Sequence, residues 1–164
     1  MSGADMVDMI NNSTMNIRPA RDADLDAVLS WEESGFEPGE RWPRASWAGE
    51  LAADDRDVLV AEADGVPVGV ITVQTVFPSS DLHRVLVASA WRRRGVARAL
   101  VEAGVDAVRD RGARKMLLEV RYDNEPAIEL YGRYGFEQLA VRKDYYGAGK
   151  DALIMKLYDL QEDA

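Results

Sequence analysis

Residues 85–97 read Val-Leu-Val-Ala-Ser-Ala-Trp-Arg-Arg-Arg-Gly-Val-Ala and join a strand-like apolar run to a long amphipathic pattern. After Gly95 the apolar positions follow helical spacing as far as Arg111. A helix N-terminus carries about half a positive charge and several amides without intrahelical acceptors, so adjacent arginines are unfavourable there. A bound pyrophosphate would explain them, and a solvated basic run is an equally good explanation from these residues alone.

The sequence on both sides of residues 85–97 predicts one α/β domain without internal repeats. Strands are expected at 15–18, 58–63, 66–77, 82–88, 115–121, 136–143 and 152–157, and helices at 22–35, 46–53, 95–111 and 124–134. The Asp64-Gly65 pair predicts a tight hairpin between two of the strands. We expect a disordered extension over 1–14, a domain over 15–160 and a tail over 161–164.

Composition excludes several kinds of chemistry. The 164 residues include no cysteine and one histidine, His83, so thiol nucleophiles and metal cages of several histidines are ruled out, and we expect no metal site. The net charge of −9 argues against nucleic acid as a partner. No apolar run approaches about 20 residues and no signal peptide is recognisable, so we expect a soluble cytoplasmic protein that binds no membrane.

The acidity is concentrated in residues 1–64, which hold 15 acidic and 5 basic side chains. Four of the acidic residues, Glu32, Glu33, Glu37 and Glu40, lie near the end of the first predicted helix. They could attract a basic partner over long range, or they could serve solubility alone.

Glu119 lies in the apolar run 116–120, where its neighbours on both faces look buried. A carboxylate removed from water holds its proton more tightly, which moves it towards the range that a general base needs. Alternatively, Glu119 faces a polar cavity or pairs with Arg121 or Arg84. Sequence alone leaves both readings open.

Tyr131 and Asn124 belong to the short helix that follows. Tyr131 lies on the apolar stripe of that helix, where an aromatic usually packs in the core, although a phenol that faces a cleft could act as a general acid. Asn124 precedes Glu125-Pro126 and fits the N-cap position.

Together, the strand Val85-Leu86-Val87 and the R-x-x-G-x-A segment Arg92 to Ala97 resemble the cofactor motif of the GCN5-related N-acetyltransferase (GNAT) superfamily. The resemblance spans about Asn16 to Leu157. It implies acetyl-coenzyme A (acetyl-CoA) as donor, with strand amides holding pantetheine and the loop holding pyrophosphate. The implied cofactor contacts are Val85, Leu86, Val87, Arg93, Arg94, Gly95, Val96, Ala97, Arg98 and Asn124. It also implies a mixed, mostly antiparallel sheet of about seven strands, splayed between the strands of Val87 and Glu119 and flanked by about four helices.

The segment 118–127, with Leu130-Tyr131 and Gly135-Phe136, is similar to the branch that acetylates the N-terminal alanine of ribosomal protein S18. In that branch Glu119 matches the base and Tyr131 the acid. Tyr145 and Tyr146 resemble a tyrosine pair that covers the incoming peptide in protein N-terminal acetyltransferases. Without the family they form an aromatic loop beside two glycines.

Two departures from the family pattern bear on the acceptor: Arg84 stands where a small or neutral residue is common, and Ala88-Ser89 where Asp-Pro is common. His83 and Arg84 could face the acceptor pocket, where a cation is unfavourable unless an acid offsets it. We therefore expect acetyl transfer to a protein N-terminus, with S18 as the suggested partner, by a monomer or homodimer. The alternatives are a small amine, amino acid or antibiotic as acceptor, or a non-catalytic acyl-CoA-binding module.

Overall fold

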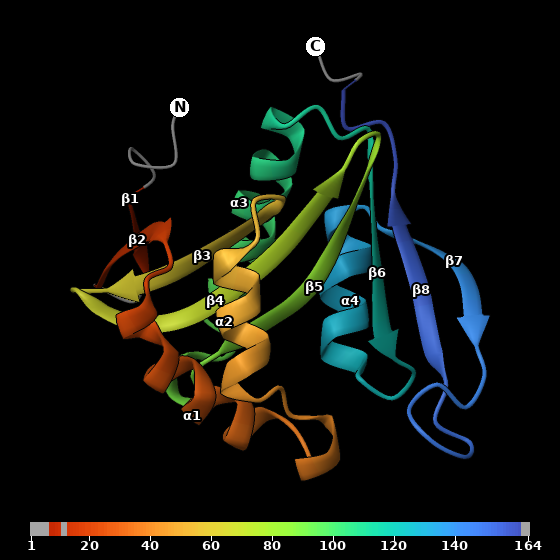
Figure 1. Ribbon diagram of the computed structural model, residues 1–164, viewed down its shortest axis with the longest axis horizontal. Coiled ribbons are helices and arrows are strands. Elements are labelled where there is room, and N and C mark those ends of the chain that lie inside the picture. The colour runs from red at the N-terminus through yellow and green to blue at the C-terminus, as the bar shows by residue number, and fades with distance from the viewer. Residues whose placement is uncertain (1–6, 11–12, 162–164) are drawn as a thin grey trace.

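A computed structural model describes residues 7–10 and 13–161 of the protein (Figure 1). Within them, eight strands form one sheet in the order β1-β2-β3-β4-β5-β6-β8-β7, with four α-helices. The strands are β1 Val7–Ile10, β2 Ser13–Pro19, β3 Arg56–Ala63, β4 Val66–Val76, β5 Ser79–Val87, β6 Lys115–Arg121, β7 Glu137–Arg142 and β8 Ala152–Leu157. The helices are α1 Leu25–Gly35, α2 Arg44–Ala52, α3 Val96–Asp110 and α4 Glu125–Tyr134, with short 3-10 turns η2 Asp22–Asp24, η3 Pro38–Glu40 and η4 Ser89–Trp91.

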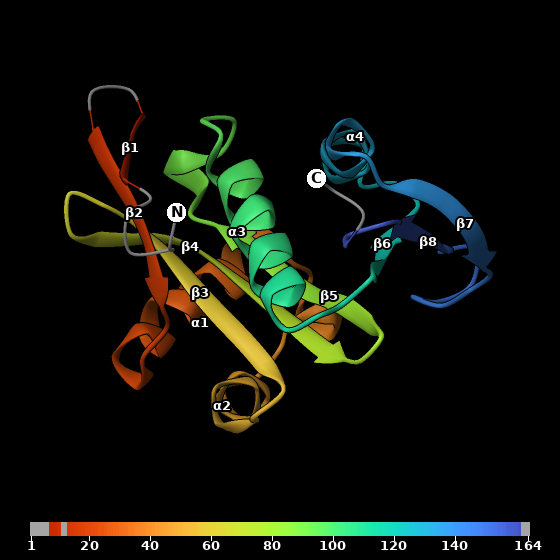
Figure 2. The same cartoon turned by 90° about the horizontal axis from the view of Figure 1, so that it is seen from above.

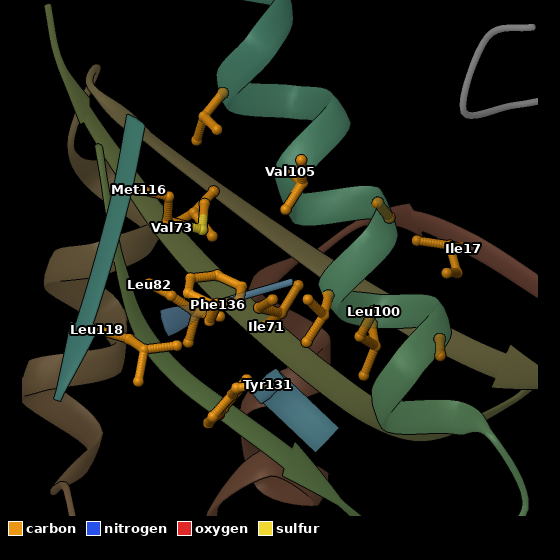
Figure 3. Close-up of a cluster of buried hydrophobic side chains, with 14 of the residues drawn as sticks. Ile17, Ile71, Val73, Leu82, Leu100, Val105, Met116, Leu118, Tyr131 and Phe136 are labelled. Carbon is orange, nitrogen blue, oxygen red and sulfur yellow. The ribbon is translucent and has the colours of Figure 1, made fainter. Parts of the chain in front are cut away.

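The helices cover the two faces of the sheet, with α1 and α2 on one face and α3 and α4 on the other (Figure 2). Successive β4 residues alternate between two cores, with Val70 packing in the α1–α2 core and Ile71 in the α3–α4 core. Gly104 brings α3 close to the sheet, because a Cβ there would lie 2.9 Å from a methyl carbon of Ile71. Figure 3 shows the α3–α4 core.

The predicted mixed, mostly antiparallel sheet is confirmed, since β5 and β6 form a parallel pair and the other neighbouring strands pair antiparallel. The hairpin at Asp64-Gly65 is also confirmed, with φ values of 50° and 83° at the two turn residues. β5 begins at Ser79 instead of Leu82. The added polar residues are easily mistaken for a loop, but Ser80 is buried and donates its hydroxyl to the carbonyl of Lys115 at 2.7 Å.

The expected disordered extension differs from the structure at residues 7–10, which form β1, and at residues 13 and 14, which begin the antiparallel partner strand β2. This is why the sheet has eight strands instead of about seven. Backbone pairing with an open sheet edge requires no side-chain periodicity, so a four-residue strand leaves little signal in the sequence. The rest of the predicted extension up to residue 12 and the tail from residue 162 lie outside the described residues, and the expected domain limits stay a prediction.

Candidate active site

The sheet opens between β5 and β6. These strands pair only where Ser79 to Leu82 run beside Lys115 to Leu118, and each continues beyond that point. The amide of Ala88 donates to Val68 at 2.8 Å. By the alternation of an antiparallel ladder, the main-chain groups of Val85 and Val87 therefore face the opening. The predicted splay between the strands of Val87 and Glu119 is present.

A β-bulge brings two basic residues to the same face of β5. Thr72 pairs with Arg84 and Val73 with Leu82, which leaves His83 as the extra residue of β5. His83 and Arg84 consequently both line the hollows beside the opening, although regular alternation would place them on opposite faces.

Two adjoining hollows occupy this region. The entrance hollow, of about 860 Å³, lies among the end of α1, the loop before α2, β5, β6 and the start of α4. The rear hollow, of about 760 Å³, lies among α2, β5, β6 and β8. Both are lined by Trp42, Leu82, His83, Arg84, Glu119, Tyr145 and Tyr146.

Beyond the C-terminal end of β5, the predicted phosphate loop forms a tight turn before α3. Gly95 is the N-cap residue with φ of 85°, and Arg93 also has a positive φ, 62°. No side chain caps the helix, so the first amides of α3 are available to a ligand. A Cβ at Gly95 would meet nothing within 4 Å, so this position is open to an approaching group.

The arginines of this turn lack carboxylate partners. Among the described residues, Arg92, Arg93, Arg94 and Arg98 form no ion pair within the 4.0 Å that defines one. The Arg94 guanidinium lies 4.7 Å from the ring centroid of Trp91, and the Arg98 guanidinium 5.4 Å from that of Tyr134. Four uncompensated cations beside free helix amides suit a polyanionic ligand such as a pyrophosphate.

Glu119 differs from its expected environment. Its neighbours Leu118 and Val120 are buried, but only on one face of β6, and Glu119 points from the other face into both hollows. Its side chain is 33% exposed and accepts a hydrogen bond from Arg142 at 2.7 Å. The prediction that both faces of β6 are buried at Glu119 is wrong. Only the face that carries Leu118 and Val120 packs in the core, and the other face borders the hollows. The suggested partners Arg84 and Arg121 pair elsewhere, with Glu32 and Glu40.

Tyr131 approaches the same opening from the opposite face of the sheet. Its ring packs in the α3–α4 core, with its centroid 5.7 Å from that of Phe136 (Figure 3). Tyr131 also lines the entrance hollow. Burial raises the pKa of Tyr131, and the neighbouring Tyr146 adds to this. The phenol therefore holds its proton at neutral pH, as a general acid must.

Asn124 caps α4 as predicted, accepting a hydrogen bond from the amide of Ala127 at 3.3 Å, and it lines the entrance hollow. The capping role accounts for its position. Its expected contact with a cofactor stays a prediction.

Tyr145 and Tyr146 lie in the turn between β7 and β8 and line both hollows. Their rings pack edge to face with centroids 5.0 Å apart. A hydrogen bond to Glu119, and the charge of that carboxylate, raise the pKa of Tyr145. The structure thus joins the tyrosine pair to Glu119, although 26 residues separate Tyr145 from it in the chain.

Arg84 is tied into a buried network that the sequence did not reveal. Its guanidinium donates to Glu32 at 2.6 and 3.1 Å and to the carbonyl of Glu40 at 2.8 Å. It lies 3.7 Å from the ring centroid of Phe36 and 5.0 Å from that of Trp42. The acid that offsets this cation is therefore Glu32, and Glu32 is too buried to act as one of the surface charges expected near the entrance. No local signal links these residues, because 52 positions separate the pair.

Comparison with known proteins assigns the family. The model of the "Acetyltransferase (GNAT) family" matches residues 25–136. The chain belongs to the GNAT family. An N-alpha-acetyltransferase of Sulfurisphaera tokodaii is 31% identical over 152 residues, covering 85% of this chain and 90% of the relative. A [ribosomal protein bS18]-alanine N-acetyltransferase of Salmonella typhimurium is 33% identical over 135 residues, covering 79% and 82%.

Solved GNAT structures agree with the fold. The crystal structure of the ribosomal-protein-S18-alanine N-acetyltransferase from Escherichia coli superposes with a TM-score of 0.79 at 27% identity, covering 88% of this chain and 94% of that one. The GNAT chain described here is thus an N-acetyltransferase with the expected fold. Across residues 7–10 and 13–161, no helix has the length and apolarity to span a membrane, and no group of three potential metal-ligating side chains is present.

Proposed function

We propose that the protein transfers the acetyl group of acetyl-CoA to the N-terminal amine of a polypeptide. The observation that carries the proposal is that Glu119 and Tyr131 reach one opening in the sheet from its two faces. A proton acceptor and a proton donor are thereby available on the two sides of a group bound between β5 and β6.

The residues around the opening fit acetyl-CoA. The amides at the start of α3, with Arg93, Arg94 and Arg98, supply donors and positive charge for the pyrophosphate, and the main chain of Val85 and Val87 can pair with pantetheine along the open edge of β5. When bound, acetyl-CoA supplies the acetyl group as a thioester.

The chain's own residues then supply proton transfer and positioning. Glu119 removes a proton from the incoming ammonium, directly or through water, so that the neutral amine can attack the thioester carbon. A β5 amide near Val87 donates to the thioester oxygen as negative charge develops there. Tyr131 gives its proton to the departing thiolate, and the proton that the attacking nitrogen loses as the amide forms restores the Tyr131 phenol through water. Tyr145 and Tyr146 cover the peptide against Glu119.

For the acceptor we propose the N-terminal alanine of ribosomal protein S18, on the strength of the bacterial relatives that carry this activity in their names. The tyrosine pair beside Glu119 supports a polypeptide more than a small amine, because it extends the lining of the site beyond the reacting group.

The test is acetyl transfer measured by mass spectrometry with acetyl-CoA and four acceptors: a peptide with the S18 N-terminus, an unrelated alanine-led peptide, a free amino acid and an aminoglycoside. The Glu119→Gln protein serves as the background control. Transfer to peptides supports the proposal, and transfer confined to the S18 peptide supports S18. Transfer only to small amines would establish the alternative acceptor, and donor binding without transfer would establish a binding module.

A further inference from the structure

The rear hollow contains a carboxylate that the proposed chemistry does not use. Asp81 lines it, half-buried, and within the described part of the chain its side chain has no hydrogen-bond or ion-pair partner. Burial raises the pKa of Asp81, with the nearby charge of Glu119 acting in the same direction and His83 opposing it. The charged carboxylate is therefore favoured only by the more distant His83 and has no direct cationic partner among the described residues.

Asp81 stands at a defined place relative to Glu119. It is in register with Leu117 on the parallel strand β6, and Glu119 is two residues further along on the same face. Two residues of a strand advance about 7 Å. When the N-terminal amine of an acceptor peptide is bound at Glu119, a long side chain on the second residue of that peptide can therefore reach Asp81.

The other ionisable groups around the rear hollow already have partners. His83 lies 2.9 Å from Glu50, which also accepts from Arg56 at 3.1 Å, while Arg84 is paired with Glu32 and Arg142 with Glu119. Asp81 is the carboxylate left over among the described residues of the hollow. Apolar side chains of Trp42, Leu117 and Ile154 also line it and suit the aliphatic stem of a basic residue.

We propose that the rear hollow is a specificity subsite for a lysine or arginine side chain next to the acetylated amine, with Asp81 as its counterion. The proposal rests on the proposed function, since it presumes a polypeptide acceptor. A partly desolvated ion pair of this kind favours a basic over a neutral acceptor by about 10-fold.

The experiment compares hexapeptides Ala-X-Ser-Gly-Ser-Gly in which X is arginine or its neutral analogue citrulline, with kcat/KM measured at saturating acetyl-CoA. Wild type should prefer arginine by about 10-fold. Asp81→Asn should bring the ratio close to one through loss of the arginine peptide alone. Asp106→Asn is the matched control, because Asp106 is a half-buried carboxylate on α3 whose pKa burial also raises. It should retain the full preference.

Equal rates for the two peptides in wild type, or an unchanged ratio in Asp81→Asn, would overturn the subsite and leave the proposed function standing. Failure to acetylate either peptide or the S18 peptide would overturn both. The wild-type comparison keeps the proposal testable even if the Asp81 variant does not fold.

Discussion

The Arg84 guanidinium donates two hydrogen bonds to the buried Glu32 carboxylate, and this ion pair joins β5 to α1 at the wall of the entrance hollow. Glu32 also accepts from the amide of Trp42 at 3.0 Å and from the indole of Trp47 at 2.9 Å. The carboxylate is thereby saturated with donors, and the loop before α2 is fixed as a wall of the site.

Arg84→Met should lower the free energy of unfolding by about 3 kcal/mol, because it leaves Glu32 charged and unpaired in the core. Adding Glu32→Gln to that variant should recover part of the loss. Urea denaturation of the two single variants and the double variant measures the coupling. Strictly additive losses would contradict the pairing.

In folded Arg84→Lys, the acceptor KM should rise while the affinity for acetyl-CoA stays unchanged. Lysine keeps the charge but loses the planar guanidinium that contacts the rings of Phe36 and Trp42 and donates to the carbonyl of Glu40. Steady-state kinetics with varied peptide and calorimetry with acetyl-CoA separate the two effects. A rise in the donor dissociation constant alone would show that the network serves the donor side.

Gly95→Asp should abolish acetyl-CoA binding, and Gly95→Asn should largely preserve it. Both side chains tolerate a positive φ better than most, and they have nearly the same shape, so the comparison isolates a negative charge beside the pyrophosphate. Calorimetric titration measures both affinities, with thermal unfolding to establish that each variant is folded. Equal binding by the two variants would remove the phosphate loop from its proposed role.

Glu119→Gln should lower kcat by about 100-fold or more, because the amide does not accept the proton of the incoming ammonium. Tyr131→Phe should lower kcat with little change in donor binding. Each change nearly preserves packing. Full activity in both variants would show that neither residue is catalytic. Glu119 would then serve only as the ion-pair partner of Arg142, and Tyr131 only as a core aromatic.

Much of the fold could be predicted from the sequence because periodicity, the Asp64-Gly65 turn and the glycine before α3 are local signals. The exceptions depend on distant partners. The start of β5 required the carbonyl of Lys115, and the environment of Glu119 required knowing that one face of β6 borders a hollow. The bulge at His83 interrupts the period of two, so alternation alone could not place both His83 and Arg84 beside the opening. Asp81 lay outside the strand predicted at 82–88.

Asp24 gives a stability test away from the site. Hydrogen bonds from Arg18, both at 2.8 Å, hold the pKa of Asp24 below its usual value, and its burial acts in the opposite direction. Asp24→Asn should lower the free energy of unfolding by about 2 kcal/mol at pH 7, because the charged hydrogen bonds from Arg18 are lost. The pKa of Asp24 is lower in the folded state than in the unfolded state. The stability that wild type gains over the variant is therefore fully present above pH 3.8, the pKa of the unfolded state, and is lost as the pH falls through the lower pKa of the folded state. Urea unfolding of both proteins at pH 7 and at successively lower pH checks this, and a pH-independent difference would contradict it.

If the acidic N-terminal part steers a basic acceptor, exposed Glu33 and Glu37 carry the effect, since Glu32 is buried. Added salt should then lower peptide kcat/KM less in Glu33→Gln/Glu37→Gln than in wild type, because screening acts on exposed charges. Glu102→Gln/Asp110→Asn on α3, with the same charge change on the opposite face, is the control. If peptide kcat/KM depends equally on salt concentration in all three proteins, the acidic residues do not steer the acceptor and serve solubility instead.

A polypeptide α-amine as acceptor is tested by locating the acetyl group on a product. A peptide with an N-terminal alanine, an arginine next to it and one internal lysine is incubated with the protein and acetyl-CoA, and the product is fragmented by tandem mass spectrometry. If the acceptor is a polypeptide α-amine, the acetyl group is found on the first residue alone. An acetyl group on the lysine side chain, or none on the peptide, would contradict it.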